Sequence, residues 1–160
     1  GVFRHVKTAE GWKTDRIMHL PFAHRCDILN VDGTNYLFAA SASKHKDNPL
    51  DWSNAGETYV MTLDNEGNPS EPQLLKGNLW RNHGMLKWAV DGKETILVSG
   101  AEGIFALDKT EEGWEERLVF DHEVSEFGFV DLDKDGNDEL VTIEPFHGNT
   151  INVYKKVDGV

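Results

Sequence analysis

A short internal repeat limits the possible folds of this chain more than any other feature. Residues 1–12 align with residues 103–114 without a gap, and seven of the twelve positions are identical. Both segments end in a tryptophan, Trp12 and Trp114, which we expect to pack between neighbouring elements. Self-similarity of this kind is typical of architectures built from repeated structural units. The chain is therefore predicted to fold as a series of similar units.

The sequence contains three Asp-Gly pairs, and a run of residues that favour β-strands follows each of them. The pairs are Asp32-Gly33, Asp91-Gly92 and Asp135-Gly136. An Asp-Gly pair between two apolar runs is a strong hairpin signal, because glycine readily takes the positive φ of a tight turn. Further strand-like segments follow each hairpin, at residues 58–63, 103–107 and 150–154.

These segments predict an all-β chain, because no stretch shows a sustained apolar period of 3.6 residues. Four-stranded meanders of about 45 to 60 residues are typical of β-propeller blades. The whole of residues 1–160 is predicted to be one such region. Its units are a partial blade at 1–20, full blades at 24–77 and 84–120, and a partial blade at 127–156.

The predicted region is too short to close on itself. Even small propellers have about four complete blades, so three to four units form an incomplete arc with unpaired sheet edges. Two explanations stay open: the segment belongs to a longer protein, or copies of the chain assemble as a homo-oligomer.

The composition argues against two classes of partner. The chain has 28 acidic and 16 basic residues and a formal net charge of -12, which disfavours a nucleic-acid partner. No window reaches the roughly 18 apolar residues that a membrane-spanning helix requires, so no membrane span is predicted. Cys26 is the single cysteine and cannot form an internal disulfide, and we expect it to be buried.

Carboxylates alternate along a short acidic segment near the C-terminal end of the sequence. Asp131, Asp133, Asp135 and Glu139 occupy relative positions 1, 3, 5 and 9, and Gly136 occupies position 6. Calcium takes six to eight oxygen ligands, and a tight loop can turn alternate carboxylates toward one centre. The segment therefore predicts a calcium site. The alternative is an acidic turn whose aspartates accept hydrogen bonds from backbone N–H groups.

The same segment, with the apolar strand after it, resembles the repeats of FG-GAP and VCBS β-propellers. Those repeats carry Asp-x-(Asp/Asn)-x-Asp-Gly-x-x-(Asp/Glu) before an apolar strand. The resemblance implies that calcium is held by Asp131, Asp133, Asp135, Glu139 and the backbone carbonyl of Asn137, and that it stiffens the blade. It also favours an extracellular or cell-surface location. The other two hairpins lack most of these carboxylates, so one calcium ion per chain is expected.

Most of the histidines are predicted to gather at the opposite end of the strands, because successive hairpin tips of a meander alternate between two ends. His24 and His83 each stand eight residues before their Asp-Gly aspartate, whereas His122 is out of register. The candidate ligand-binding residues at this end are His24, Arg25, His45, Trp52, Arg81, His83, His122 and His147. Imidazoles suit a second divalent metal such as zinc or manganese, or acid–base chemistry, and tryptophan can stack on a sugar.

No local motif defines a reaction, since the sequence has no nucleophile elbow, phosphate-binding loop or dinucleotide fingerprint. The leading hypothesis is a calcium-stabilised module that binds a carbohydrate or a protein through its histidine-rich face. The second follows from similar propellers that are sugar lyases or dehydratases, and it makes His24, His83 and His122 candidate bases, acids or metal ligands. The third is a purely structural assembly unit.

Overall fold

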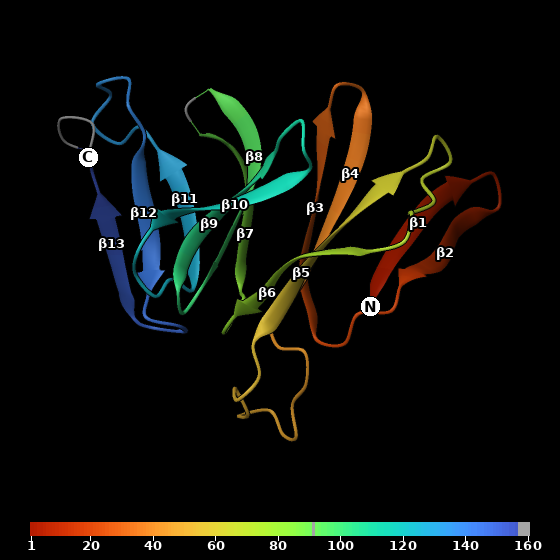
Figure 1. The fold of residues 1–160 in the computed structure, drawn as a ribbon, viewed down its shortest axis with the longest axis horizontal. Coiled ribbons are helices and arrows are strands. Elements are labelled where there is room, and N and C mark those ends of the chain that lie inside the picture. The colour runs from red at the N-terminus through yellow and green to blue at the C-terminus, as the bar shows by residue number, and fades with distance from the viewer. Residues whose placement is uncertain (91, 157–160) are drawn as a thin grey trace.

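The computed structural model describes residues 1–90 and 92–156, and every regular element within those residues is a β-strand. Thirteen strands form four antiparallel sheets in the described ranges (Figure 1). The all-β prediction is therefore confirmed. Asp91, at the tip of the second predicted hairpin, lies outside the described residues. No helix in the described part of the chain is long and apolar enough to cross a membrane.

The strands of each sheet lie side by side in chain order, so each sheet is a simple meander. The first sheet contains β1 (Val2–Thr8) and β2 (Gly11–Met18). The second contains β3 (Ala23–Val31), β4 (Thr34–Ser41), β5 (Gly56–Leu63) and β6 (Gln73–Leu79). The third contains β7 (Gly84–Val90), β8 (Lys93–Gly100), β9 (Gly103–Lys109) and β10 (Trp114–Phe120). The fourth contains β11 (Glu126–Val130), β12 (Glu139–Glu144) and β13 (Thr150–Tyr154).

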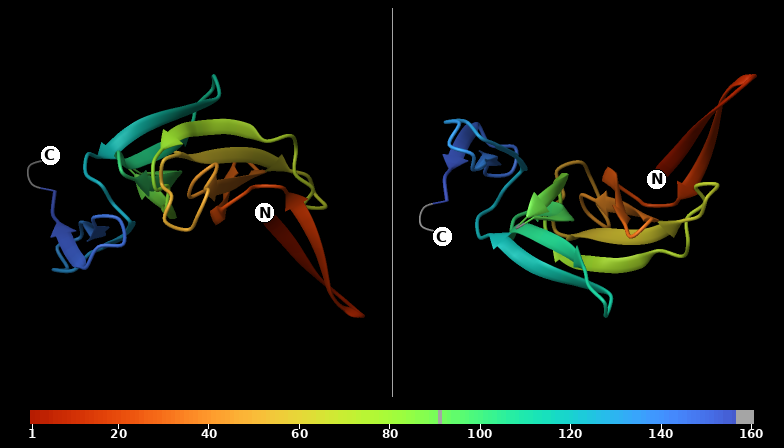
Figure 2. Two further views of the ribbon diagram at one scale, coloured as in Figure 1. Left: turned by 90° about the horizontal axis from the view of Figure 1, so that it is seen from below. Right: turned by 90° about the horizontal axis from the view of Figure 1, so that it is seen from above.

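Neighbouring sheets pack face to face in a curved row (Figure 2). Side chains alternate between the two faces of a strand, so a strand in the middle of the row is buried on both sides. In β4, Leu37 packs with the first sheet and Phe38 packs with the third. In β8, Ile96 packs with the second sheet and Leu97 packs with the fourth. The hydrophobic core is therefore divided into three layers between four sheets.

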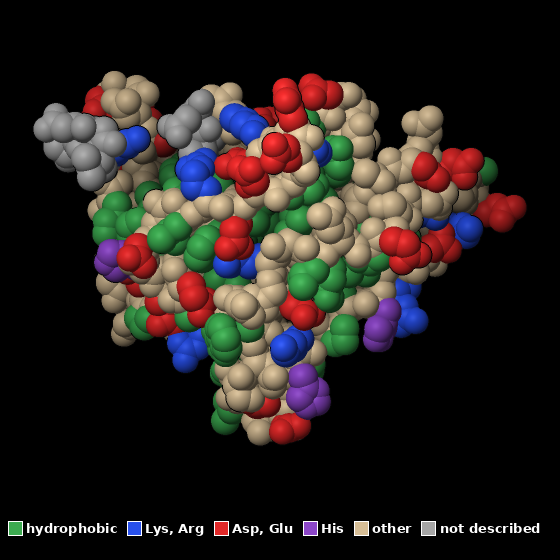
Figure 3. Space-filling model, viewed as in Figure 1, with side chains coloured by type: hydrophobic (Ala, Val, Ile, Leu, Met, Phe, Trp, Pro, Cys, Tyr) green, Lys and Arg blue, Asp and Glu red, His purple; other side chains and the backbone are tan. Residues whose placement is uncertain are grey.

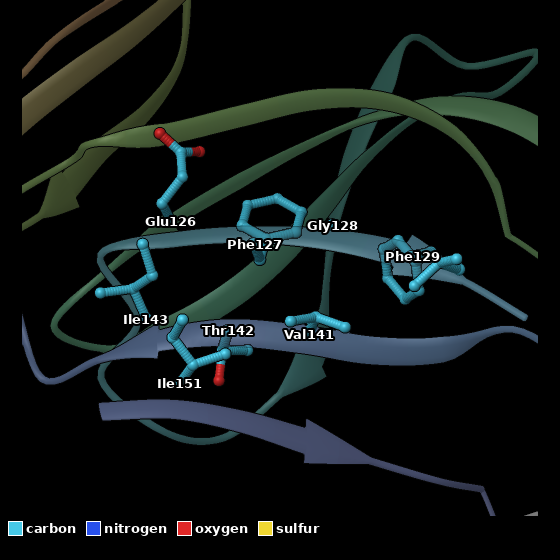
Figure 4. A pocket seen from close by; sticks show the side chains of 9 residues that line it. Glu126, Phe127, Gly128, Phe129, Val141, Thr142, Ile143 and Ile151 are labelled. Carbon is cyan, nitrogen blue, oxygen red and sulfur yellow. The ribbon is translucent and has the colours of Figure 1, made fainter. Parts of the chain in front are cut away.

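The fourth sheet has one face that no other described sheet covers. Leu140 on β12 packs toward the third sheet, so the alternate residues Val141 and Ile143 face the other way. They pair with Val153 and Ile151 of β13, which are 54% and 71% exposed. Val141, Ile143 and Ile151 line a shallow apolar hollow of about 340 Å³ (Figure 4). We call this surface the free face of the fourth sheet.

Two predictions about buried side chains are resolved by this arrangement. Trp114 packs edge-on against Tyr36 and Phe38 of the second sheet, with ring centroids 5.1 Å apart in each pair. Trp12 is 69% exposed, so the prediction that it packs between sheets is wrong. The prediction that Cys26 is buried is also wrong, because the two-stranded first sheet leaves it exposed.

The connections between strands fall at two opposite ends of the sheets (Figure 1). The β3–β4 turn and the β11–β12 loop lie at one end, which we call the Asp-Gly end. The β4–β5 and β12–β13 loops lie at the other end, which we call the histidine end. Acidic side chains are spread over much of the surface seen in Figure 3, in keeping with the net charge of -12.

Candidate functional site

The β11–β12 loop, residues 131–138, wraps its backbone around its own carboxylates. Asp131 accepts hydrogen bonds from the backbone N–H groups of Asp135, at 3.1 Å, and Gly136, at 3.0 Å. Asp133 accepts a second bond from the N–H of Asp135 at 3.2 Å. Lys134 and Gly136 both have positive φ, 62° and 90°, which lets the chain turn sharply twice. The backbone-capping pattern expected of an acidic turn is therefore present.

Glu139 adds a buried carboxylate to this loop. Its relative exposure is 3%, and its Oε2 accepts the backbone N–H of Leu132 at 2.8 Å. Its buried Oε1 has no hydrogen-bond donor among the described residues. Burying a carboxylate whose charge is only partly compensated costs free energy, and a bound cation would remove much of that cost. This oxygen without a hydrogen-bond donor points to a cation ligand more directly than the capping bonds do.

The donor atoms of the loop fit a hard divalent cation. Carboxylate oxygens of Asp131, Asp133 and Glu139 lie within 4.8 Å of one another, and calcium prefers such oxygen ligands. Asp135 is outside this group of three and instead accepts hydrogen bonds from the backbone and side chain of Asn137, at 2.9 and 3.1 Å. The geometry thus brings together three of the four carboxylates singled out in the sequence.

Lys155 also reaches this loop, which the sequence did not predict. Its ammonium group contacts Asp133, lies 2.6 Å from Asp135 and is 3.5 Å from Oε1 of Glu139. The hydrogen bond from Lys155 is the main cause that lowers the pKa of Asp135 to about 2. The register explains the contact: Tyr154, the last residue of β13, pairs with Leu140, so the residue after it lies beside Glu139.

At the histidine end, three imidazoles from distant parts of the sequence form one cluster. The rings of His24 and His83 lie 4.1 Å apart between centroids, and those of His83 and His147 lie 5.1 Å apart. Nδ1 of His83 lies 3.0 Å from the backbone carbonyl of Ser125, which can only accept a hydrogen bond. We therefore assign the proton to Nδ1, and the lone pair of Nε2 faces Nε2 of His147 at 3.4 Å.

The cluster is formed because the first strands of consecutive sheets lie next to each other: β3 contacts β7, and β7 contacts β11. His24 lies on β3 and His83 comes directly before β7. Burial, followed by the proximity of His24, lowers the pKa of His83 to about 4. Burial and the neighbouring Arg25 lower the pKa of His24 as well. Both imidazoles are therefore uncharged at neutral pH.

The two arginines predicted for this site are paired with glutamates. Arg25 forms an ion pair with Glu126, and its Nε donates to the backbone carbonyl of His83 at 3.1 Å. Arg81 forms an ion pair with Glu123. The arginines thus hold the histidine cluster in place, and their charges are already compensated.

Phe146 joins the cluster, although no pattern in the sequence pointed to it. Its ring stacks on His147 with centroids 4.0 Å apart and contacts His83 edge-on at 5.5 Å. On its other side it meets Trp52 edge-on at 4.7 Å. An aromatic row therefore links the imidazoles to the long β4–β5 loop.

A pocket of about 530 Å³ lies between this loop and the start of β3. It is lined mainly by apolar and aromatic side chains, with a few polar groups among them: Phe22, His24, Lys46, Asn48, Pro49 and Trp52. The ammonium group of Lys46 lies 2.9 Å from the centroid of the Trp52 ring. Such a mixture of an aromatic wall and a few polar groups is typical of small-molecule sites.

Two of the predicted histidines lie apart from the cluster. His122 stacks on Phe120 at 4.8 Å and contacts Tyr154 at 6.2 Å, because it follows the last strand of the third sheet rather than a first strand. His45 is exposed and pairs with Asp47 at 2.9 Å. The contacts of His122 and His45 are therefore with these neighbours rather than with His24 and His83.

The geometry thus defines an acidic loop at one end of the sheets and a histidine–aromatic site at the other. In comparisons with protein-family models, curated proteins and solved structures, nothing matches this chain.

Proposed function

We propose that the chain is a segment of a β-propeller of the FG-GAP/VCBS type that binds a carbohydrate at its histidine end. Three observations support the propeller: each sheet is a meander in chain order, consecutive sheets pack face to face, and their first strands lie side by side (Figure 2). These are the relations expected between neighbouring blades around an axis.

The acidic loop is proposed to bind one calcium ion through Asp131, Asp133 and Glu139. The supporting observation is the buried Oε1 of Glu139, which no hydrogen-bond donor among the described residues satisfies. Calcium would bind that oxygen directly and tie the β11–β12 loop to the start of β12. Its role in this proposal is structural.

The carbohydrate proposal depends on one observation, the aromatic pocket of about 530 Å³ beside the histidine cluster. Sugars present both an apolar C–H face and hydroxyl groups. Trp52 offers an aromatic wall, one face of which the Lys46 ammonium group covers, while Asn48 and His24 offer further polar groups. The uncharged imidazole of His24 can donate a hydrogen bond to a hydroxyl group or accept one from it.

This proposal is tested by screening the full chain against immobilised glycans and then comparing two tryptophan variants. Trp52→Ala is expected to weaken glycan binding at least about tenfold, because buried tryptophans at binding sites contribute strongly to affinity. Trp12→Ala is the matched control, since Trp12 is 69% exposed on the distant first sheet and should leave binding unchanged. Absence of glycan binding, or equal binding by both variants, would contradict the proposal.

A second candidate function is a metal-assisted enzyme of the sugar lyase or dehydratase type. One observation favours it: Nε2 of His83 and Nε2 of His147 are 3.4 Å apart. Two nitrogens that bind zinc at about 2.0–2.1 Å in a tetrahedral site lie about 3.3–3.4 Å apart. The bond from Nδ1 of His83 to Ser125 also resembles the support that metal-binding histidines receive.

Metal analysis of the purified chain separates the two candidates. Stoichiometric zinc or manganese that is lost in His83→Gln, with calcium retained, would favour the enzyme. Calcium alone, unaffected by His83→Gln, would favour the binding module. Proton transfer in the enzyme would then fall to His24, the imidazole packed beside His83.

A further inference from the structure

Lys155 brings a positive charge into the acidic loop from a different strand. Its ammonium group contacts the carboxylates of Asp133 and Asp135 and approaches Glu139. An ammonium group is a compact charge with three N–H donors, so it can serve several carboxylates at once. The side chain occupies the side of the loop on which these carboxylates converge.

The ammonium group and a calcium ion would draw on the same carboxylates. Asp133 and Glu139 belong both to the group of three carboxylates within 4.8 Å and to the partners of Lys155. Calcium binds oxygens at about 2.3–2.6 Å, which leaves no room for an ammonium group on those atoms. Two positive charges at such short range also repel each other. Occupation by one cation therefore excludes the other.

Lys155 compensates the negative charge of the loop carboxylates only in part. It is within hydrogen-bonding distance of Asp135, at 2.6 Å, but Oε1 of Glu139 is 3.5 Å away and has no hydrogen-bond donor in the described residues. Glu139 is the most deeply buried carboxylate of the group, at 3% exposure. The oxygen that most needs a cation is thus the one that Lys155 serves least well.

We propose that Lys155 is a tethered competitor of calcium, which sits among the loop carboxylates when calcium is absent and is displaced when calcium binds. The proposal rests on the calcium site proposed above. Because Lys155 directly follows β13, displacement also releases the end of that strand from the β11–β12 loop. The lysine therefore lowers the calcium affinity of the loop and couples calcium occupancy to the edge of the fourth sheet.

The test is calcium titration calorimetry on the full chain with two lysine variants. Lys155→Met removes the competitor and is expected to tighten calcium binding by about tenfold or more, the scale of a charged hydrogen-bond partner. Lys156→Met is the matched control, because it removes the same charge one residue later. Among the described residues Lys156 makes no ion pair with the loop. The calcium affinity of Lys156→Met should therefore stay within about twofold of wild type.

Thermal unfolding supplies a second readout that does not depend on measuring affinity. In a chelator, Lys155→Met should unfold at a lower temperature than Lys156→Met, because its loop carboxylates are left without a counter-charge. At saturating calcium the two variants should unfold at the same temperature.

The possible failures are distinguishable. If wild type binds calcium and Lys155→Met binds no tighter than Lys156→Met, the competitor proposal is overturned and the calcium site stands. If no variant binds calcium, the calcium site itself is overturned and the competition with it. If Lys155→Met alone binds calcium, both proposals are supported, since the lysine then blocks the site completely.

Discussion

The two ends of the sheets gather charge in opposite ways. At the Asp-Gly end, the β11–β12 loop concentrates carboxylates around Glu139, and Lys155 is the cation that reaches them in the described structure. At the histidine end, Arg25 and Arg81 each have a glutamate partner. The neighbouring imidazoles are uncharged at neutral pH, because the pKa values of His24 and His83 are lowered.

This difference indicates what each end can bind. An excess of carboxylates is stabilised by an added cation, whereas a balanced set of ion pairs gains little from one. The balanced end instead gathers aromatic side chains and neutral imidazoles beside a pocket, which suits an uncharged polar ligand. The ends should therefore respond to different variables, calcium at the first and pH at the second.

The largest expected effect is stabilisation by calcium. At a free calcium concentration of 100 times the dissociation constant, wild type should gain about 2.7 kcal/mol in its free energy of unfolding. That gain corresponds to an unfolding temperature about 5–10 °C higher for a chain of this size. Glu139→Gln should abolish the shift, because it removes the buried ligand charge while keeping the side-chain size. The measurement is thermal unfolding with and without calcium.

Asp32→Asn provides the control for this experiment. Asp32 belongs to the Asp-Gly pair of the β3–β4 turn, at the same end of the sheets but in a tight turn with φ of 50°. Asparagine tolerates that conformation well. The calcium response should therefore be retained in Asp32→Asn. An equal response in Glu139→Gln would contradict the assignment of calcium binding to the β11–β12 loop.

A somewhat smaller effect is expected from pH at the histidine end. The unfolded chain protonates His83 near pH 6.5, but the folded protein does so only near pH 4. Between these values the unfolded state binds more protons, so stability falls as the pH is lowered. The slope from this group is at most about 1.4 kcal/mol per pH unit.

The pH effect is measured by urea unfolding at pH 5, 6 and 7 in the presence of a chelator. His83→Asn keeps an N–H donor near the carbonyl of Ser125 but cannot titrate, so its stability should vary less with pH than that of wild type. His5→Asn, on exposed β1, should keep the wild-type slope. Parallel slopes for all three proteins would show that the cluster does not hold His83 neutral.

The sequence predicted the features that depend on neighbouring residues. The Asp-Gly pairs and alternating apolar residues were sufficient to predict an all-β chain, because turn and strand preferences act over a few residues. The carboxylates from Asp131 to Glu139 were recognisable for the same reason. They lie on one short loop and on the first residue of the strand that follows it, so residues close in the sequence are also close in space.

The features that the sequence did not predict depend on contacts between distant segments. Lys155 reaches the loop only through the register of β13 against β12, and Phe146 meets Trp52 only because two long loops lie at the same end. The spacing of His122 marked it as out of register, but it did not reveal that this histidine follows an outer strand and stacks on Phe120. Trp12 repeats the position of Trp114, but the sheet that would cover it is not among those described.

The smallest expected effect separates two hairpin tips within the Asp-Gly end. In the β3–β4 turn, Asn30 donates to Asn35 at 2.8 Å and accepts the N–H of Gly33 at 3.2 Å. This turn is closed by neutral amides rather than by carboxylates. Asn30→Ala should therefore cost about 1 kcal/mol or less in the free energy of unfolding, because the bonds are exposed.

The cost of Asn30→Ala should be the same with and without calcium, as measured by urea unfolding. A calcium-dependent cost would mean that the β3–β4 turn communicates with the β11–β12 loop, or binds the ion itself. A calcium-independent cost would instead assign the response to the one tip where Glu139 is buried without a hydrogen-bond donor for its Oε1 among the described residues. The demand for a cation would then follow from that buried oxygen rather than from the Asp-Gly pair that the two hairpins share.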